Sequence, residues 1–240
     1  MKSLQYLISK SINTNITEAS SKTIYEDPEK QAVIDEIKKY YYGNHKSNWT
    51  PAMFSSFIIS DTPNADGKFI VDIKSKPLSD ITFKTSELNS IVHEKFIWGK
   101  CDIDFYIDNC ENLTSLEGLP SNFDNDSYIE ISKCSKLNSL VGCPQELNEL
   151  SIIDSSIPSL NGCPQDLLEL KIKNCSNITF DYCPKKISQF VFFKAYNWSG
   201  NQQKIDFSNI LKSNISVLTT DKSSAEDMLG NLLNCRLILK

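Results

Sequence analysis

Eight cysteines give this chain of 240 residues its clearest potential for chemistry. Cysteines can hold a metal ion or form disulfides, but the chain has no CxxC pair and no Cys/His cluster at zinc-ligand spacing. Most of them recur instead at two fixed positions of a repeated pattern, which is typical of small buried side chains with a weak S–H donor. We therefore expect reduced thiols, no disulfide and no bound metal. The recurring residues are Cys110, Cys134 and Cys175 at one position, and Cys143, Cys163 and Cys183 at the other.

The two histidines, His45 and His93, stand outside any recognisable catalytic or ligand pattern. His45 lies in the polar stretch GNHKSN, which is typical of a solvated loop, and His93 lies between apolar segments, which favours a structural role. The chain also has no phosphate-binding glycine loop and no G-x-S-x-G sequence. The sequence therefore predicts no catalytic residue, no cofactor and no enzymatic activity.

Composition narrows the class of partner. The net charge is −5, and Arg236 is the only arginine among 25 basic residues. Nucleic-acid recognition relies on the planar, bidentate guanidinium, so we expect no nucleic-acid partner. No apolar run approaches the ~18 residues that span a bilayer. The apolar stretch at residues 4–8 is too short for a secretory signal, which predicts a protein that is neither secreted nor membrane-bound.

A pattern repeated five times fills residues 105–193 and must position any binding surface. Each copy opens with two apolar residues that are separated by one other residue, which is typical of a short strand with one buried face. The prolines Pro120, Pro144, Pro164 and Pro184 follow at separations of 24, 20 and 20 residues. Units of this length cannot bury their apolar side alone, so they stack into a solenoid. The apolar pairs are Phe105/Ile107, Ile129/Ile131, Leu150/Ile152, Leu170/Ile172 and Phe190/Phe192.

In each copy, the residues that follow the strand are expected to be extended and to lead back to the start of the next strand. We call this segment the return path. A small polar residue (Cys110, Cys134, Ser155 or Cys175) follows each pair, where it can satisfy backbone groups as the chain leaves the strand. Apolar residues then point inward, glycine permits a tight bend, and proline favours extended backbone. Copies of 20 residues leave no room for a convex helix. The expected fold class is α+β, a solenoid with one short parallel strand per coil and an extended convex side.

Amphipathic segments at both ends predict helical caps. Asp27-Pro28-Glu29 supplies an N-cap, a first-position proline and an acidic first turn, and Gly43 is the expected stop. A partner-binding helix is the alternative for this segment. Near the other end, Ser223–Glu226 reads as a capping box before a helix that reaches Leu237. The predicted divisions are a leader and linker (1–26), a capping helix (27–43), a connecting segment (44–62), the solenoid (63–207) and a C-terminal cap with a helix (208–240).

The repeat pattern L-x-x-L-x-I-x-x-C-x-x-L-x-S-L-x-G-C-P resembles a short leucine-rich repeat, with Cys where many members have Asn. The run NADGKFIVDIKSKPLSDITFKTSELNSIV, followed by FYIDNCENLTSLEGLP, resembles leucine-rich-repeat-like proteins of tailed bacteriophages. The resemblance covers residues 63–194 and implies a right-handed solenoid that binds rather than catalyses. The chain departs from the pattern after Pro184, where the leucines and the Gly-x-Pro are lost.

The first residues resemble the capsid-targeting leaders of internal head proteins of tailed phages. MKSLQYLISKSI places apolar residues on one helical face, and Ile16-Thr17-Glu18 followed by Ala19 matches the aliphatic-x-Glu sequence at which such leaders are cleaved. The resemblance implies a processing site at Ile16, Glu18 and Ala19. A disordered tail or an extra capping segment is the alternative.

The outward positions of the strands form the expected partner-binding face, in two columns. Their character changes along the stack from acidic and aromatic, through basic, to apolar, which suits a protein partner. We expect a monomer that binds a host or virion protein, in the host bacterial cytoplasm and the virion interior. The alternative is a cytoplasmic structural or effector repeat protein without virion targeting. The first column is Tyr106, Glu130, Ser151, Lys171 and Val191, and the second is Asp108, Ser132, Ile153, Lys173 and Phe193.

Overall fold

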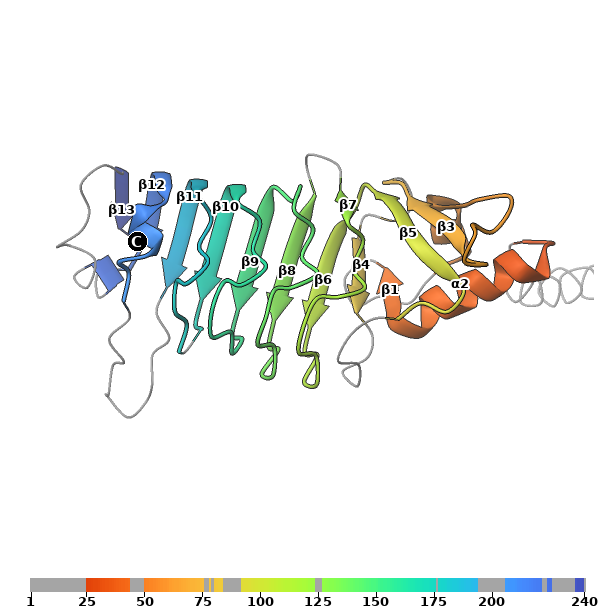
Figure 1. The fold of residues 1–240 in the computed structure, drawn as a ribbon, viewed down its shortest axis with the longest axis horizontal. Coiled ribbons are helices and arrows are strands. Elements are labelled where there is room, and N and C mark those ends of the chain that lie inside the picture. Colours follow the sequence, from red (N-terminus) through yellow and green to blue (C-terminus); the bar gives the residue numbers. More distant parts are fainter. Residues whose placement is uncertain are drawn as a thin grey trace, which may run out of the picture.

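The structure, a computed structural model, describes residues 25–43, 50–75, 78, 80–83, 92–123, 127–175, 177–193, 206–221, 224–225 and 236–239. In these residues the chain winds into a β-solenoid whose strands stack along one long axis (Figure 1). Neighbouring strands of its nine-stranded sheet are parallel except for β1 with β4. In spatial order this sheet contains β1 (Tyr41–Gly43), β4 (Asp80–Phe83), β6 (Asp104–Asp108), β8 (Tyr128–Ser132), β9 (Glu149–Ile153), β10 (Asp166–Lys173), β11 (Lys186–Phe193), β12 (Asn214–Thr220) and β13 (Arg236–Leu239).

The strands predicted from the apolar pairs are confirmed, together with their register. Equivalent residues of successive copies lie opposite one another, as Ile131 does with Ile152 and Ile152 with Ile172. These side chains are fully buried, so each coil adds one layer to a continuous core. The sheet also extends past residue 207, the predicted end of the solenoid, through β12 and β13.

The return path is extended and buries a second set of apolar side chains. Gly142 and Gly162 have φ values of 93° and 92°, which suit glycine. A Cβ at Gly142 would lie 2.3 Å from the backbone nitrogen of Glu117 in the preceding coil, so glycine also permits the coils to approach. The predicted inward positions are confirmed, since all of the following are buried: Leu113, Leu116, Leu137, Leu140, Ile157, Leu160, Ile178 and Phe180.

A left-handed residue turns the chain off each strand. Asn109, Lys133, Asp154 and Asn174 have positive φ, and the N–H of Asp154 donates to the carbonyl of Lys173 in the next coil at 2.9 Å. The next residue is the predicted small polar position. There the thiol of Cys134 donates to the carbonyl of Ser132 at 3.3 Å, which confirms that this side chain satisfies the end of the strand.

A second sheet of four strands covers part of the opposite side. It contains β2 (Phe57–Ile59), β3 (Phe69–Ile73), β5 (Phe96–Cys101) and β7 (Asn122–Phe123) in that order. The 3-10 helix η1 (Pro51–Ser56) leads directly into β2. Residues 44–62, expected only to connect, therefore contribute a strand that pairs antiparallel with β3.

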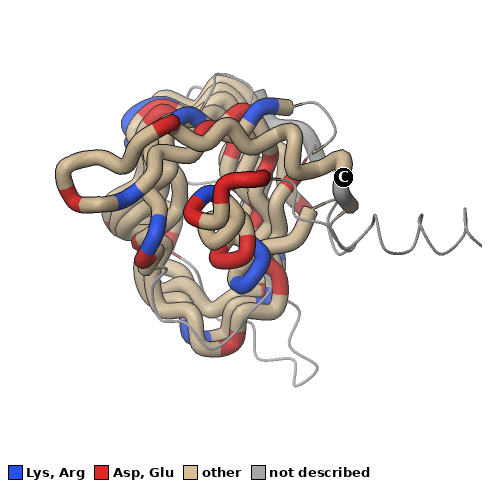
Figure 2. Tube along the Cα trace, turned by 90° about the vertical axis from the view of Figure 1, so that its right-hand side faces the viewer, with Lys and Arg blue, Asp and Glu red and all other residues tan. Residues whose placement is uncertain are grey.

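One α-helix, α2 (Pro28–Tyr40), is present in the described part of the chain. The Asp27 carboxylate accepts a hydrogen bond from the N–H of Glu29, as predicted for an N-cap. Viewed along the solenoid, α2 lies within the outline of the stacked coils (Figure 2), and Val33, Ile34 and Ile37 are fully buried. The predicted end at Gly43 is wrong. Tyr41 is already extended because β1 pairs with β4.

The predicted C-terminal helix is wrong at Leu237. That residue lies in β13, paired with Leu218 of β12, so the segment extends the sheet where a helix was expected. A helical turn is present at Ser224 and Ala225, capped by Asp221, whose carboxylate accepts from the N–H of Ser224 at 2.9 Å. Residues 226–235 of the predicted helix lie outside the described residues.

Candidate protein-binding face

The outer face is the side of the nine-stranded sheet that points away from the core. Side chains two residues apart on a strand share this face. Eight of the ten predicted positions are partly or fully exposed on it, namely Tyr106, Asp108, Glu130, Ser132, Ile153, Lys171, Lys173 and Phe193.

Two predicted positions are buried, so the expectation that they are exposed on this face is wrong. Ser151 is fully buried and Val191 is only 8% exposed. Ser151 lies opposite Glu130 on one side and Lys171 on the other, so longer neighbours cover its short side chain. Alternation along a strand indicates the direction of a side chain, but the size of its neighbours decides whether solvent reaches it.

The outer face also includes a third column that the sequence analysis missed. It lies two residues before the first column and contains Asp104, Tyr128 and Glu149. The sequence contains the signal for this column, because the alternation of inward and outward residues can be extended two residues towards the start of each strand. With the first column, it forms a lattice in which carboxylates alternate with tyrosines. We call Asp104, Tyr106, Tyr128, Glu130 and Glu149 the acidic–aromatic patch.

Hydrogen bonds order the side chains of this patch. The Tyr128 hydroxyl donates to Glu130 Oε2 at 2.6 Å, and the Tyr128 N–H donates to Asp104 Oδ1 at 3.2 Å. The rings of Tyr106 and Tyr128 meet edge to face, with centroids 5.8 Å apart. The patch is thus preorganised on adjacent strands of a rigid sheet.

Burial and neighbouring negative charge act on the ionisable groups of the patch. Partial burial raises the pKa of the Asp104 carboxyl, and the charges of Asp80 and Glu149 raise it further against the hydrogen bond from Tyr128. Burial and the hydrogen bond to Glu130 likewise raise the pKa of Tyr128. The carboxylates therefore repel one another, and the phenols stay protonated at neutral pH.

The other half of the face has a different chemistry. Lys171 and Lys173 project from β10, and Phe193 lies opposite Lys173 on β11. Ile153 on β9 lies on the other side of Lys173. The predicted change from acidic and aromatic, through basic, to apolar character is therefore present along the stack.

The seven cysteines in the described residues are free thiols, and six of them are buried. Burial raises the pKa of the Cys143 thiol to about 12 and that of Cys175 to about 11. Thiols of this kind stay protonated and unreactive at neutral pH. Cys183, expected to be buried, is partly exposed.

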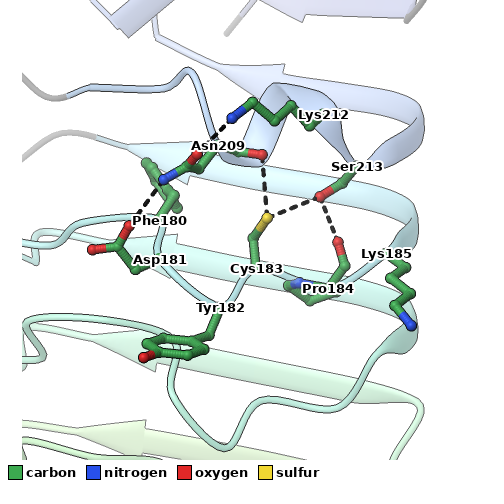
Figure 3. Close-up of a pocket in the computed structure, with 9 residues that line it drawn as sticks. All are labelled: Phe180, Asp181, Tyr182, Cys183, Pro184, Lys185, Asn209, Lys212 and Ser213. Carbon is green, nitrogen blue, oxygen red and sulfur yellow. Dashed lines mark hydrogen bonds between the residues drawn. The ribbon is translucent and has the colours of Figure 1, made fainter.

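Cys183 lines a pocket of about 310 Å³ on the return path (Figure 3). Its thiol donates to the carbonyl of Asn209 at 3.2 Å and lies 3.4 Å from the Ser213 hydroxyl, which itself donates to the carbonyl of Pro184. The thiol proton thus points to a backbone carbonyl, which cannot act as a general base. Tyr182 at the rim has φ of 62° and is 69% exposed. It occupies the position that Gly142 and Gly162 hold in earlier coils.

His93 has the structural environment that its sequence context favours. Its ring stacks on Phe96 with centroids 4.0 Å apart, and Nε2 lies 3.2 Å from the carbonyl of Gly118. Burial lowers the pKa of His93 to about 4, and the charge of Lys68 contributes to the lowering. The imidazole is therefore neutral and packed among aromatic rings at neutral pH.

Several further observations bear on chemistry and on relatives. In the described part, no three His, Cys, Asp or Glu side chains are arranged to hold a metal ion. Within the same residues, no helix is long and apolar enough to cross a membrane.

The predicted processing site at Ile16, Glu18 and Ala19 and the second histidine, His45, lie outside the described residues. Comparison with models of known protein families, with curated proteins and with solved structures found no match.

Proposed function

We propose that this chain is a non-enzymatic protein-interaction module that binds a protein partner through the outer face. The observation that carries the proposal is the ordered change of side-chain chemistry along β6 to β11. One half presents carboxylates and phenols, and the other presents Lys171, Lys173 and Phe193. A mixed face on a rigid scaffold suits a folded protein partner, whereas a phosphate backbone requires a continuous basic surface.

We further propose that the chain belongs with the leucine-rich-repeat-like proteins of tailed phages and acts as a monomer in the host cytoplasm and the virion. Its coils would be right-handed, with α2 covering one open end. The support is the 20-residue repeat with its Gly-Cys-Pro turns and the leader-like segment before Ala19. Mass spectrometry of protein from purified particles tests this proposal. A mature N-terminus at Ala19 supports virion delivery, and an intact N-terminus with absence from particles contradicts it.

Capture experiments with matched variants test the interaction face. The wild-type protein is immobilised and exposed to host lysate and to disrupted phage particles. The face variant combines Lys171→Glu with Lys173→Glu, and its control combines Lys136→Glu with Lys185→Glu, two exposed lysines of the return path. Both variants change the net charge equally. We expect the wild type and the control to retain a partner that the face variant loses. Equal retention by all three would contradict binding through this face.

A further inference from the structure

We propose that the acidic–aromatic patch binds a lysine or arginine side chain of the partner, an inference that rests on the proposed interaction function. Asp104, Tyr128 and Glu149 follow one another along one column, and Tyr106 and Glu130 lie side by side in the next. Adjacent strands are about 4.8 Å apart, so both tyrosine rings lie within reach of one ammonium or guanidinium group. The three carboxylates surround the same region of the face.

The carboxylates of the patch lack a cation within the described structure. Asp104, Glu130 and Glu149 form no ion pair with any other described residue. The first lysine in the column of Glu130 is Lys171, and Ser151 lies between the two residues. Burial is the main cause of the raised pKa of Asp104, and a cation bound between the carboxylates would offset the smaller contribution that comes from neighbouring negative charge.

The tyrosines supply the part of the site that distinguishes it from a plain acidic surface. A cation within about 6 Å of a tyrosine ring centroid is attracted by the negative face of the ring. Tyr106 and Tyr128 are both partly exposed and meet at 71°, so they present differently oriented faces to the same space. The Tyr128 phenol is oriented by its hydrogen bond to Glu130.

A buried hydroxyl at the edge of the patch is a second, independent indication of a ligand. Thr82 lies on β4 directly opposite Tyr106, and the neighbouring Ile81 and Phe83 point into the core. Thr82 is fully buried, and its Oγ1 has no hydrogen-bond partner among the described residues. Such atoms are normally satisfied. Thr82 lies between Tyr42 and Tyr106, so a polar group of the partner would supply the missing hydrogen bond only after these covering side chains move.

The sign of the charge selects the class of partner. An acidic patch repels nucleic acid and acidic peptides, whereas a basic protein segment is attracted. The spacing of about 4.8 Å between coils lets one segment place consecutive basic side chains on the patch as it crosses the strands. A lysine- or arginine-bearing segment of a folded protein therefore fits this half of the outer face.

The experiment uses an acetylated hexalysine peptide as the probe and the full chain as the receptor. Calorimetry and NMR titration measure its affinity at low and at physiological ionic strength. The test variant combines Glu130→Gln with Glu149→Gln, which keeps side-chain size and removes two charges. Its control, Glu117→Gln with Glu146→Gln, removes the same charge from exposed return-path positions. A further variant, Tyr128→Leu, removes one ring.

We expect about a tenfold loss of affinity in the test variant, which corresponds to about 1.4 kcal/mol, and less than a twofold change in the control. Tyr128→Leu should weaken binding several-fold, and salt should weaken wild-type binding. Equal weakening in the test and control variants would overturn the proposal, because net charge alone would then explain it. Absence of peptide binding to the wild type would also overturn it. If partner capture still depends on Lys171 and Lys173 in that case, the interaction function stands without this site.

Discussion

The backbone N–H of Cys134 donates a 3.1 Å hydrogen bond to the hydroxyl of Ser155, which occupies the equivalent position in the next coil. The same hydroxyl donates to the carbonyl of Ile153 at 2.9 Å. One side chain thus joins two coils and closes the end of its own strand. In the following coil, the Cys175 thiol takes the equivalent place and donates to the carbonyl of Lys173 at 3.5 Å, which closes the end of its own strand. Serine and cysteine are interchangeable here because both accept and donate.

Ser155→Ala should therefore destabilise the protein while Ser155→Cys should not. Alanine leaves the buried N–H of Cys134 and the carbonyl of Ile153 without this partner, which costs about 1–3 kcal/mol. Cysteine restores a donor and an acceptor, so its cost should stay below about 1 kcal/mol. Urea unfolding of both variants measures the difference. Equal stability of Ser155→Ala and wild type would show that the hydroxyl bridge contributes nothing.

Substitutions at the coil bend should have opposite effects at two equivalent positions. In Gly162→Ala, the new Cβ would lie 2.4 Å from backbone atoms of Leu140 and Val141, so we expect a loss of about 2 kcal/mol or more. Tyr182 adopts φ of 62° at the equivalent position, a conformation that costs an L-residue about 1–2 kcal/mol. Tyr182→Gly should therefore raise the stability by about 1 kcal/mol. Thermal unfolding measures both changes, with Tyr182→Ala as the control that retains the strain. A less stable Tyr182→Gly variant would show that the exposed ring makes a compensating contact.

Substitutions on one strand test which side chains face the core. Ile172 is fully buried, and an unpaired carboxylate there should cost several kcal/mol, so Ile172→Asp should unfold the solenoid. Lys171→Ala, on the outer face of the same strand, should change the unfolding free energy by less than about 0.5 kcal/mol. Circular dichroism and thermal melts separate the two outcomes. If Lys171→Ala lowered the stability as much as Ile172→Asp, the assignment of core-facing residues on this strand would be wrong by one residue.

The stability should fall between pH 6.5 and 4 because of His93. Its pKa is lowered to about 4 in the folded protein by burial, against a reference value of 6.5. The folded state therefore binds fewer protons than the unfolded state in this window, and the contribution present above pH 6.5 is lost as pH falls towards 4. The difference amounts to about 3 kcal/mol at low pH. In His93→Gln, the slope of unfolding free energy against pH should be smaller over this window. An NMR titration midpoint near 6.5 for the His93 ring would contradict this assignment.

Thiol reactivity should reflect burial. In the folded protein, Cys183 should react first with a thiol reagent, because it is the one partly exposed cysteine among those described. Cys143 and Cys175 should react only after unfolding, since burial raises both pKa values to about 12 and about 11. All eight cysteines should react after denaturation. Fewer groups under denaturing conditions, or a stoichiometric metal, would contradict free thiols.

The sequence alone determined the solenoid between residues 105 and 193, including which residues of each strand point into the core. The reason is local and repeated, because the alternation that buries Ile131 recurs in every coil at matching positions. The bend at Gly142 was predictable on the same basis, since its φ is a property of a short segment. The outward direction of Lys171 and Lys173 followed from the same alternation.

In other segments, contacts with residues distant in the sequence set the secondary structure and the burial of side chains, and only the tertiary structure shows these contacts. Leu237 lies in an amphipathic segment, yet the unpaired edge of β12 takes it as a strand. Tyr41 continues a helical pattern but pairs with Phe83 of β4. Ser151 points outward and is still covered by longer neighbours. Edge pairing and the relative size of adjacent side chains depend on residues distant in sequence, so periodicity does not encode them. The gathering of Asp104, Tyr128 and Glu149 around one region of the face likewise depends on the stacking of three coils.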